Sequence, residues 1–174
     1  LQVTVLAVLQ GLTEFLPVSS SGHLLLPAAL FGWQDQGLTL DIAVHLGTLA
    51  AVILYLRRDL MGLVAGSYKW LLKREESYES RLALKLIVAT LPAGLAGLAL
   101  RAVIEANARS LAIVAATSII FAVLLWLADR SGARRANAVP FSELTVPGAL
   151  FIGVAQAFAL IPGTSRSGVT MTAA

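Results

Sequence analysis

Long apolar segments recur along the chain, and three of them are long enough to cross a lipid bilayer. They extend over residues 38–56, 82–100 and 111–128, and only Thr117 and Ser118 interrupt the last of these. A helix needs about 20 apolar residues to span the hydrocarbon core. The pattern therefore predicts three transmembrane helices.

Two further apolar segments are too short for this. Residues 3–16 end at Pro17, residues 146–161 end at Pro162, and a cluster of Ser and Gly follows each proline. Helices of about 14–16 residues extend roughly 21–24 Å, less than the ~30 Å core. Broken helices at membrane depth are tolerated where their free backbone groups line an enclosed or watery cavity. We therefore expect two re-entrant segments at a binding site.

The two short segments also resemble each other. An odd number of predicted crossings separates them, so they enter the membrane from opposite faces, as in inverted repeats whose halves meet near the midplane. The alternative is a chance similarity of two loops rich in small residues. A shift of 146 residues aligns Gln10 with Gln156, Ser19 with Ser165, Ser21 with Ser167, and Gly22 with Gly168.

The expected fold is an all-α integral membrane protein, a polytopic helical bundle that forms one transmembrane domain over residues 1–174. The first re-entrant repeat occupies residues 1–36, three crossings occupy 37–128, and the second repeat occupies 140–174. The composition agrees, because 57% of the residues are hydrophobic and 13% charged, against about 45–50% and 25% in soluble domains. The absence of cysteine excludes disulfides and thiolate chemistry.

The basic residues are distributed unequally between the predicted loops. Ten of them lie in 57–85 and 129–145, whereas the 101–110 loop has only Arg101 and Arg109. The positive-inside rule places the first two loops, including the loop 57–81 with a short interfacial helix over 60–72, in the cytoplasm. The net charge of +3 therefore fits anionic lipid headgroups, and we expect no nucleic-acid partner.

Gln10 and Glu14 are four residues apart in the first short segment and share a helix face. A carboxylate in an apolar segment is costly unless it is paired or bound to a metal. The alternative to a metal site is that Glu14 is paired with another residue and has only a structural role. Amide and carboxylate oxygens suit a hard divalent cation, Mg²⁺ or Ca²⁺.

Three serines precede Gly22 and a new apolar segment, so they are candidates for the N-terminus of a helix, where backbone N–H groups bind anions. Gly22 would allow close approach of a ligand. Most serine clusters are caps or solvated turns, but an acidic residue and a histidine flank this one. The residues expected to bind substrate here are Ser19, Ser21 and Gly22.

The chain has two histidines, His23 and His45. His23 directly follows the Ser/Gly turn and is a candidate nucleophile, general acid–base group or metal ligand. His45 shares a helix face with Asp41 and Thr48 that is expected to face the bundle interior. We expect a structural role for His45, or at most support for a residue that binds the ligand.

The second Ser/Gly cluster contains Arg166, which is the only basic residue in 146–174. A guanidinium among hydroxyls suits bidentate recognition of phosphate, whereas a snorkelling arginine would usually have interfacial neighbours. If the two repeats meet, a carboxylate, an imidazole and a guanidinium surround one cavity, as phosphoryl transfer requires. The expected substrate-binding residues here are Thr164, Ser165, Arg166 and Ser167.

The segments 10–23 (QGLTEFLPVSSSGH) and 162–168 (PGTSRSG) resemble the two signature motifs of the BacA-type undecaprenyl-diphosphatase family, and 45–48 (HLGT) also fits it. The resemblance covers essentially the whole chain. It implies a multi-pass enzyme of the bacterial plasma membrane that hydrolyses undecaprenyl diphosphate to undecaprenyl phosphate and phosphate. This reaction recycles the lipid carrier of peptidoglycan synthesis and confers bacitracin tolerance.

The resemblance also implies roles for individual residues. Gln10 and Glu14 match an acidic motif that binds the cation, His23 and Arg166 match essential residues, and Ser20 matches a proposed nucleophile. Whether Ser20, His23 or water attacks the phosphorus stays open. We further expect a site that faces the periplasm, membrane lipid and a polyprenyl diphosphate as partners, and a homodimer. Family members continue beyond the second motif, so the chain looks like a fragment.

Two rival hypotheses can be compared with this one, and the first of them is rejected. The sequence Ser21-Gly22-His23 is similar to an element of PAP2-type phosphatases, but the chain has no Arg-Pro pair, and Thr172 stands where that family needs a histidine. The second rival is a transporter that flips the carrier lipid, because inverted repeats are common in transporters. Such a protein would need Arg166 but has little use for His23 beside a metal-binding Glu14.

Overall fold

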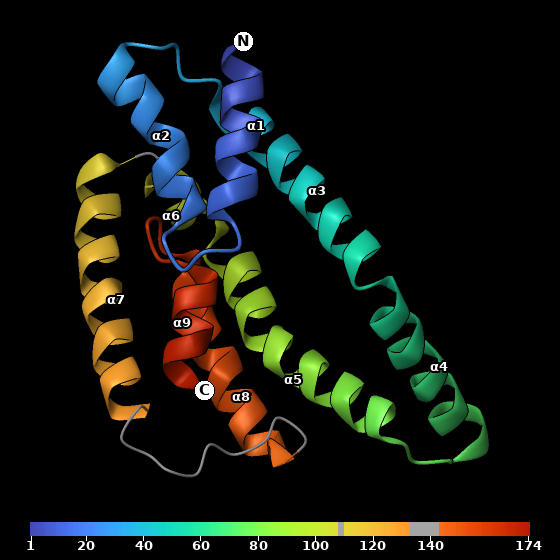
Figure 1. Ribbon diagram of the computed structural model, residues 1–174. Coiled ribbons are helices and arrows are strands. Elements are labelled where there is room, and N and C mark those ends of the chain that lie inside the picture. The colour runs from blue at the N-terminus through green and yellow to red at the C-terminus, as the bar shows by residue number, and fades with distance from the viewer. Residues whose placement is uncertain (108–109, 133–142) are drawn as a thin grey trace.

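The computed structural model describes residues 1–107, 110–132 and 143–174, and every regular element in this part of the chain is helical (Figure 1). Three helices are long and apolar enough to cross a membrane, namely α3, α5 and α7. The chain is therefore an all-α, multi-pass membrane protein. The elements are α1 (Gln2–Thr13), α2 (Ser20–Phe31), α3 (Gly37–Tyr55), α4 (Arg57–Lys73), α5 (Tyr78–Ala99), α6 (Arg101–Asn107), α7 (Leu111–Gly132), α8 (Val146–Ala157), η2 (Phe158–Leu160) and α9 (Arg166–Ala173).

The two re-entrant segments form helical hairpins that enter the molecule from opposite ends. In Figure 1, α1 runs from the top to the centre and α2 returns, whereas α8 rises from the bottom and α9 returns downwards. The hairpin tips touch, because Ser167 Oγ donates a hydrogen bond of 3.2 Å to the Leu16 carbonyl oxygen. The inverted repeat expected from the sequence is thus present, and its halves meet inside the bundle.

The second hairpin is packed between α5 and α7. Gly153 of α8 lies so close to α5 that a Cβ there would be 2.6 Å from the Ala89 carbonyl oxygen. On the other side, Ser118 of α7 donates a hydrogen bond of 3.0 Å to the carbonyl oxygen of Gly163. Helix α5 therefore packs against α8, and α7 holds the turn that leads into α9.

The long helices begin and end within a few residues of the predicted segments. The largest differences are at α5, which begins at Tyr78 rather than at residue 82, and at α7, which ends at Gly132 rather than at residue 128. Ser77 and Ser80 form a reciprocal capping box with hydrogen bonds of 3.0 and 3.2 Å, and such a cap extends a helix beyond its apolar stretch. Residues 140–142 of the second repeat, together with Arg109, Arg134 and Arg135, lie outside the described residues.

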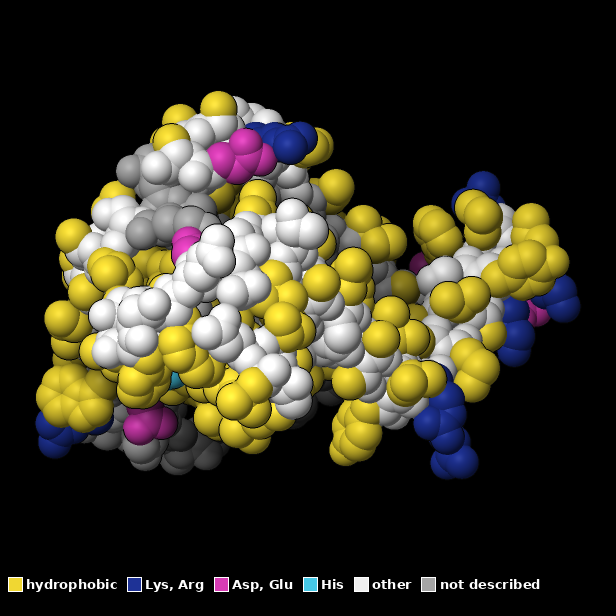
Figure 2. Space-filling view, turned by 90° about the horizontal axis from the view of Figure 1, so that it is seen from above, with side chains coloured by type: hydrophobic (Ala, Val, Ile, Leu, Met, Phe, Trp, Pro, Cys, Tyr) yellow, Lys and Arg dark blue, Asp and Glu magenta, His cyan; other side chains and the backbone are white. Residues whose placement is uncertain are grey.

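The segment expected as a short helix over 60–72 forms α4, which begins at Arg57. Figure 1 shows that α4 continues α3 away from the hairpins and that α5 then returns towards the centre. In the view from above, hydrophobic side chains cover most of the face, and Lys and Arg gather at the far end of this α3–α4 arm (Figure 2).

Polar residues occupy the interior around the hairpin tips, whereas large apolar residues cover the outside. Leu98 is 79% exposed and Ile119 is 67% exposed, but Gln10 is 0% exposed. This distribution fits a molecule surrounded by lipid tails, since buried polar groups in a membrane face the bundle interior. The other buried polar residues near the tips are Thr13, Ser19 and Thr164.

Candidate functional site

The site is built on the turn between α1 and α2. Helix α1 ends at Thr13, Glu14 is its C-terminal cap, and α2 begins at Ser20. The residue before α2, Ser19, is buried and has φ 58°, which is a costly conformation for a residue with a side chain. Such strain persists where the surroundings hold it, and here it directs the start of α2 towards Glu14.

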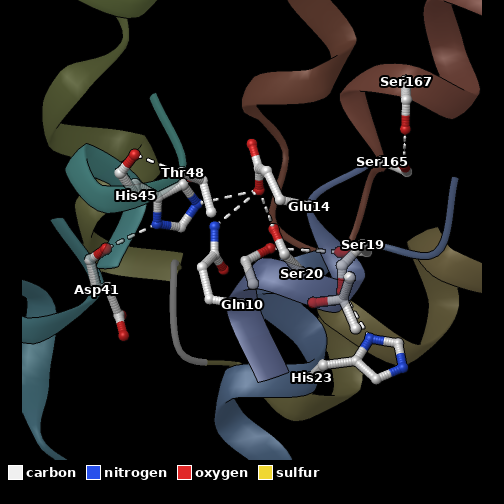
Figure 3. Close-up of polar contacts among 12 residues, drawn as sticks. Gln10, Glu14, Ser19, Ser20, His23, Asp41, His45, Thr48, Ser165 and Ser167 are labelled. Atoms are coloured by element: carbon white, nitrogen blue, oxygen red, sulfur yellow. Dashed lines mark hydrogen bonds and ion pairs between the residues drawn. The ribbon is translucent and has the colours of Figure 1, made fainter. Parts of the chain in front are cut away.

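Three side chains converge on one oxygen of the Glu14 carboxylate (Figure 3). Ser20 Oγ donates a hydrogen bond of 2.6 Å to Oε2, and Gln10 Nε2 donates one of 2.9 Å to the same atom. His45 Nε2 lies 3.6 Å from Oε2. The carboxylate therefore joins α1, α2 and α3, and a hydroxyl is in hydrogen-bond contact with a potential base.

The donor set fits a divalent cation in part. Glu14 and Gln10 share a helix face as expected, and Gln10 Oε1 is buried without a hydrogen-bond partner among the described residues. A buried acceptor without a partner is unfavourable, and a cation would satisfy it. The described residues contain no group of three His, Cys, Asp or Glu suited to a metal, so the expected Mg²⁺ or Ca²⁺ stays a prediction.

His45 lies in the site although the sequence indicated only a structural or supporting role. Its Nδ1 is 2.7 Å from the Asp41 carbonyl oxygen, one turn earlier in α3, and its Nε2 faces Glu14. The stripe of Asp41, His45 and Thr48 faces the interior as expected, since all three line the same cavity.

His23, in contrast, is separate from Glu14. Its Nδ1 lies 2.9 Å from the Ser19 carbonyl oxygen, and Figure 3 shows the ring on the far side of the turn from the carboxylate. Neither His23 nor Ser20 is among the residues that line the cavity, but Ser20 forms a hydrogen bond with Glu14. The structure therefore brings Gln10, Glu14 and Ser20 together but does not add His23 to them.

A cavity of about 610 Å³ opens beside the Glu14 carboxylate. One part of its wall is polar and includes Arg166, the first residue of α9, which forms no ion pair with any described residue. The rest is an apolar wall provided mainly by α3. The polar lining residues are Glu14, Ser21, Asp41, His45, Thr48 and Arg166, and those of the α3 wall are Leu38, Ile42, Leu46, Leu49 and Val52.

The two motifs have matching local structures. Ser19 precedes α2 and its Oγ is 3.3 Å from Ser21 Oγ, while Ser165 precedes α9 and its Oγ is 3.0 Å from Ser167 Oγ. Ser20 and Arg166 are therefore equivalent first residues of two helices that begin near the hairpin tips. Free N–H groups at these two N-termini and the guanidinium favour an anion between them.

The remaining expected substrate-binding residues do not line the cavity. Thr164 is buried, and Ser165 caps α9 by accepting a hydrogen bond of 3.3 Å from the Gly168 N–H. A Cβ at Gly22 would lie 3.1 Å from Val114 Cγ1, so this glycine allows α2 to approach α7. Contact of these residues with a substrate stays a prediction.

Thr117 and Ser118 contribute to the site, although the sequence analysis assigned them no role. Thr117 Oγ1 donates a hydrogen bond to the Pro162 carbonyl oxygen, and Ser118 Oγ donates one to that of Gly163. They hold the turn that carries Arg166. The sequence could have indicated this role, because Thr117 and Ser118 are the only polar residues in the third long apolar segment.

Comparison with known proteins agrees with this architecture. The chain is similar to proteins named undecaprenyl-diphosphatase from Saccharophagus degradans (52% identical over 174 residues, 100% of this chain) and Hahella chejuensis (53% over 174 residues, 100% of this chain). A third, from Alcanivorax borkumensis, is 50% identical over 173 residues, 99% of this chain. The chain spans 64% of the length of each relative. The family model described as bacitracin resistance protein BacA matches residues 3–174, and the chain belongs to this family.

Proposed function

We propose that this chain carries the catalytic site of a membrane phosphatase that hydrolyses undecaprenyl diphosphate to undecaprenyl phosphate and phosphate. The observation that carries the proposal is the 2.6 Å hydrogen bond from Ser20 to Glu14 beside a cavity that Arg166 lines. The names of the similar proteins support the same substrate. In the cell, the reaction recycles the lipid carrier of peptidoglycan synthesis and confers bacitracin tolerance.

The cavity suits a lipid with a charged head. Arg166 provides two parallel N–H donors for the terminal phosphate, and the N-terminus of α2 adds backbone N–H groups. The apolar side chains of α3, such as Leu46 and Leu49, line the same cavity and provide a surface for the first isoprene units. One cavity would thus hold both parts of a polyprenyl diphosphate.

Ser20 is the nucleophile in this proposal because its hydroxyl already donates to a carboxylate. Ser20 Oγ bonds to the terminal phosphorus, its proton passes to Glu14, and undecaprenyl phosphate leaves with the bridging oxygen. Water then attacks the phosphoserine. Glu14 returns its proton to Ser20 Oγ as the Oγ–P bond breaks, and dihydrogen phosphate leaves with both protons of the water.

Gln10 and Glu14 would hold a divalent cation, Mg²⁺ or Ca²⁺. The buried Gln10 Oε1 without a partner among the described residues supports this assignment. When bound, the cation neutralises charge on the diphosphate. Around it, Gln10 orients the Glu14 carboxylate through the 2.9 Å hydrogen bond to Oε2.

His23 acts as a positioning residue in this proposal. Its ring contacts the Ser19 carbonyl oxygen at 2.9 Å, one residue before Ser20, and so stabilises the strained start of α2. The side-chain amide of Asn can occupy the place of Nδ1. We therefore expect His23→Asn to retain much more activity than His23→Ala, whereas equal loss in both would indicate that His23 transfers a proton to or from substrate.

We also propose a location in the bacterial plasma membrane with the site accessible from the periplasm. The first hairpin and the basic end of the α3–α4 arm lie at opposite ends of the molecule (Figure 1), and basic residues favour the cytoplasmic side. Single cysteines introduced into a cysteine-free background of the full-length protein report the orientation. An impermeant maleimide should label Gln34→Cys but not Arg74→Cys in intact cells, and the reverse labelling would contradict it. The homodimer stays a prediction.

The test is phosphate release from undecaprenyl diphosphate by the full-length protein in detergent, with and without EDTA. We expect Glu14→Ala, Ser20→Ala and Arg166→Lys to lose more than about 100-fold of the rate, as removal of a group that acts in the transition state does. Ser131→Ala and Arg101→Lys are matched controls, because both residues are exposed and pair only within their own helices. These two variants should keep the parent rate.

Two outcomes would contradict the proposal. Folded parent protein that binds the lipid but releases no phosphate would favour the flippase hypothesis. Full activity in Ser20→Ala with loss in Glu14→Ala would exclude the serine and leave a water molecule as the nucleophile.

A further inference from the structure

His45 is held in a single orientation by the backbone of its own helix. Its Nδ1 lies 2.7 Å from the Asp41 carbonyl oxygen. A carbonyl oxygen only accepts hydrogen bonds, so Nδ1 carries the proton, and in the neutral ring Nε2 then has a free lone pair. This lone pair faces Glu14, because Nε2 is 3.6 Å from Oε2 (Figure 3).

The distance between these two atoms does not fit a direct hydrogen bond. Charge-assisted N–H···O bonds are about 2.7–2.9 Å long, and the observed separation is 3.6 Å. Two ligand atoms bound at about 2.0–2.2 Å to one divalent cation lie roughly 2.8–3.1 Å apart at octahedral angles and roughly 3.3–3.6 Å apart at tetrahedral angles. The separation of Nε2 and Oε2 lies at the upper end of this range, so one cation could be bound by both atoms.

Gln10 provides a second, independent observation. Its side chain is 0% exposed, and its Oε1 has no hydrogen-bond partner in the described part of the chain. The same amide is bound to Glu14 Oε2 through Nε2, so it lies at the carboxylate that His45 faces. A buried acceptor without a partner is unfavourable, and a cation at this position would satisfy it.

We propose that His45 binds, through Nε2, the same divalent cation as Glu14 and Gln10. The inference rests on the proposed function, because it concerns the cation of that site. It also changes the expected ion. One nitrogen and two oxygen donors favour a transition metal over Ca²⁺, which binds almost only oxygen.

The test uses Mn²⁺ as a paramagnetic probe on the full-length protein in detergent. Electron spin echo envelope modulation detects a nitrogen bound directly to Mn²⁺. We expect ¹⁴N modulation in the parent protein, its loss in His45→Ala, and its retention in His23→Ala, which removes the other imidazole within residues 1–174. The Kd for Mn²⁺ should rise at least about tenfold in His45→Ala.

Phosphate release, measured on the same samples, separates the two hypotheses. Mn²⁺ bound to the active parent in a Glu14-dependent manner but without ¹⁴N modulation would overturn the role of His45 and leave the phosphatase in place. Modulation that depends on His45 in a protein that releases no phosphate would support the metal site and contradict the enzyme. Equal loss of modulation in His23→Ala and His45→Ala would also overturn the inference.

Discussion

Gly163 occupies the most restricted backbone position in the turn that leads to Arg166. Its φ is +88°, and a Cβ there would lie 2.7 Å from Val114 Cα and closer still to Thr117 Oγ1 and the Val114 carbonyl oxygen. These atoms belong to α7, and most of them are backbone, so they cannot rotate away. Gly163→Ala must therefore shift either the turn or α7.

The expected loss in the free energy of unfolding has two contributions. A residue with a side chain in this region of φ costs about 1–3 kcal/mol, and an extra carbon in a packed contact costs about 1–3 kcal/mol. Together we expect Gly163→Ala to lower the free energy of unfolding by roughly 2–6 kcal/mol. Because Arg166 follows three residues later, phosphate release should also fall sharply.

The assay is equilibrium unfolding of the full-length protein in mixed detergent micelles, with phosphate release measured in parallel. Gly94→Ala is the matched control, since this glycine is inside α5 and a Cβ there would meet no neighbouring atom within 4 Å. Alanine in a helix is about 1 kcal/mol better than glycine, so this control should be unchanged or slightly stabilised. Equal stability and activity of the two variants would refute the tight contact between the turn and α7.

Three further predictions concern the packing around the site. Gly153→Ala should destabilise the protein by about 1–3 kcal/mol in the same unfolding assay, because its Cβ would meet the Ala89 backbone of α5. Thr117→Val should cost about 1 kcal/mol and reduce phosphate release, since it removes the donor to the Pro162 carbonyl oxygen, whereas Thr117→Ser should retain both. Ser77→Ala should cost about 1 kcal/mol through loss of the α5 cap without a change in activity per folded molecule; loss of activity there would contradict a purely structural role.

Much of the fold could be predicted because it depends on features of short, continuous segments of the sequence. Apolar length indicated α3, α5 and α7, and the prolines after the short segments indicated the two hairpins. The boundary of α5 was harder, since the cap at Ser77 extends the helix into a polar segment that hydropathy assigns to the loop. Hydropathy measures how well a segment transfers into lipid. A capping residue instead provides hydrogen bonds to the free backbone N–H groups at the start of a helix, so hydropathy does not detect it.

The site was predictable in part for the same reason. Gln10 and Glu14 meet because residues four apart share a helix face, and Arg166 reaches the same cavity because the two hairpins meet at their tips. The separation of His23 from Glu14 could not be read from their closeness in sequence. It depends on the left-handed φ of Ser19, which sets the direction in which α2 leaves the turn.

The sequence by itself determined the class of the protein, the helices that cross the membrane, the inverted hairpins and the polar residues that they bring to the interior. Only the tertiary structure decided that His45 rather than His23 lies against Glu14, and that Thr117 and Ser118 hold the second turn. Periodicity and hydropathy describe one helix at a time. Contacts between helices depend on the rotation and depth of each, which packing across the whole bundle sets.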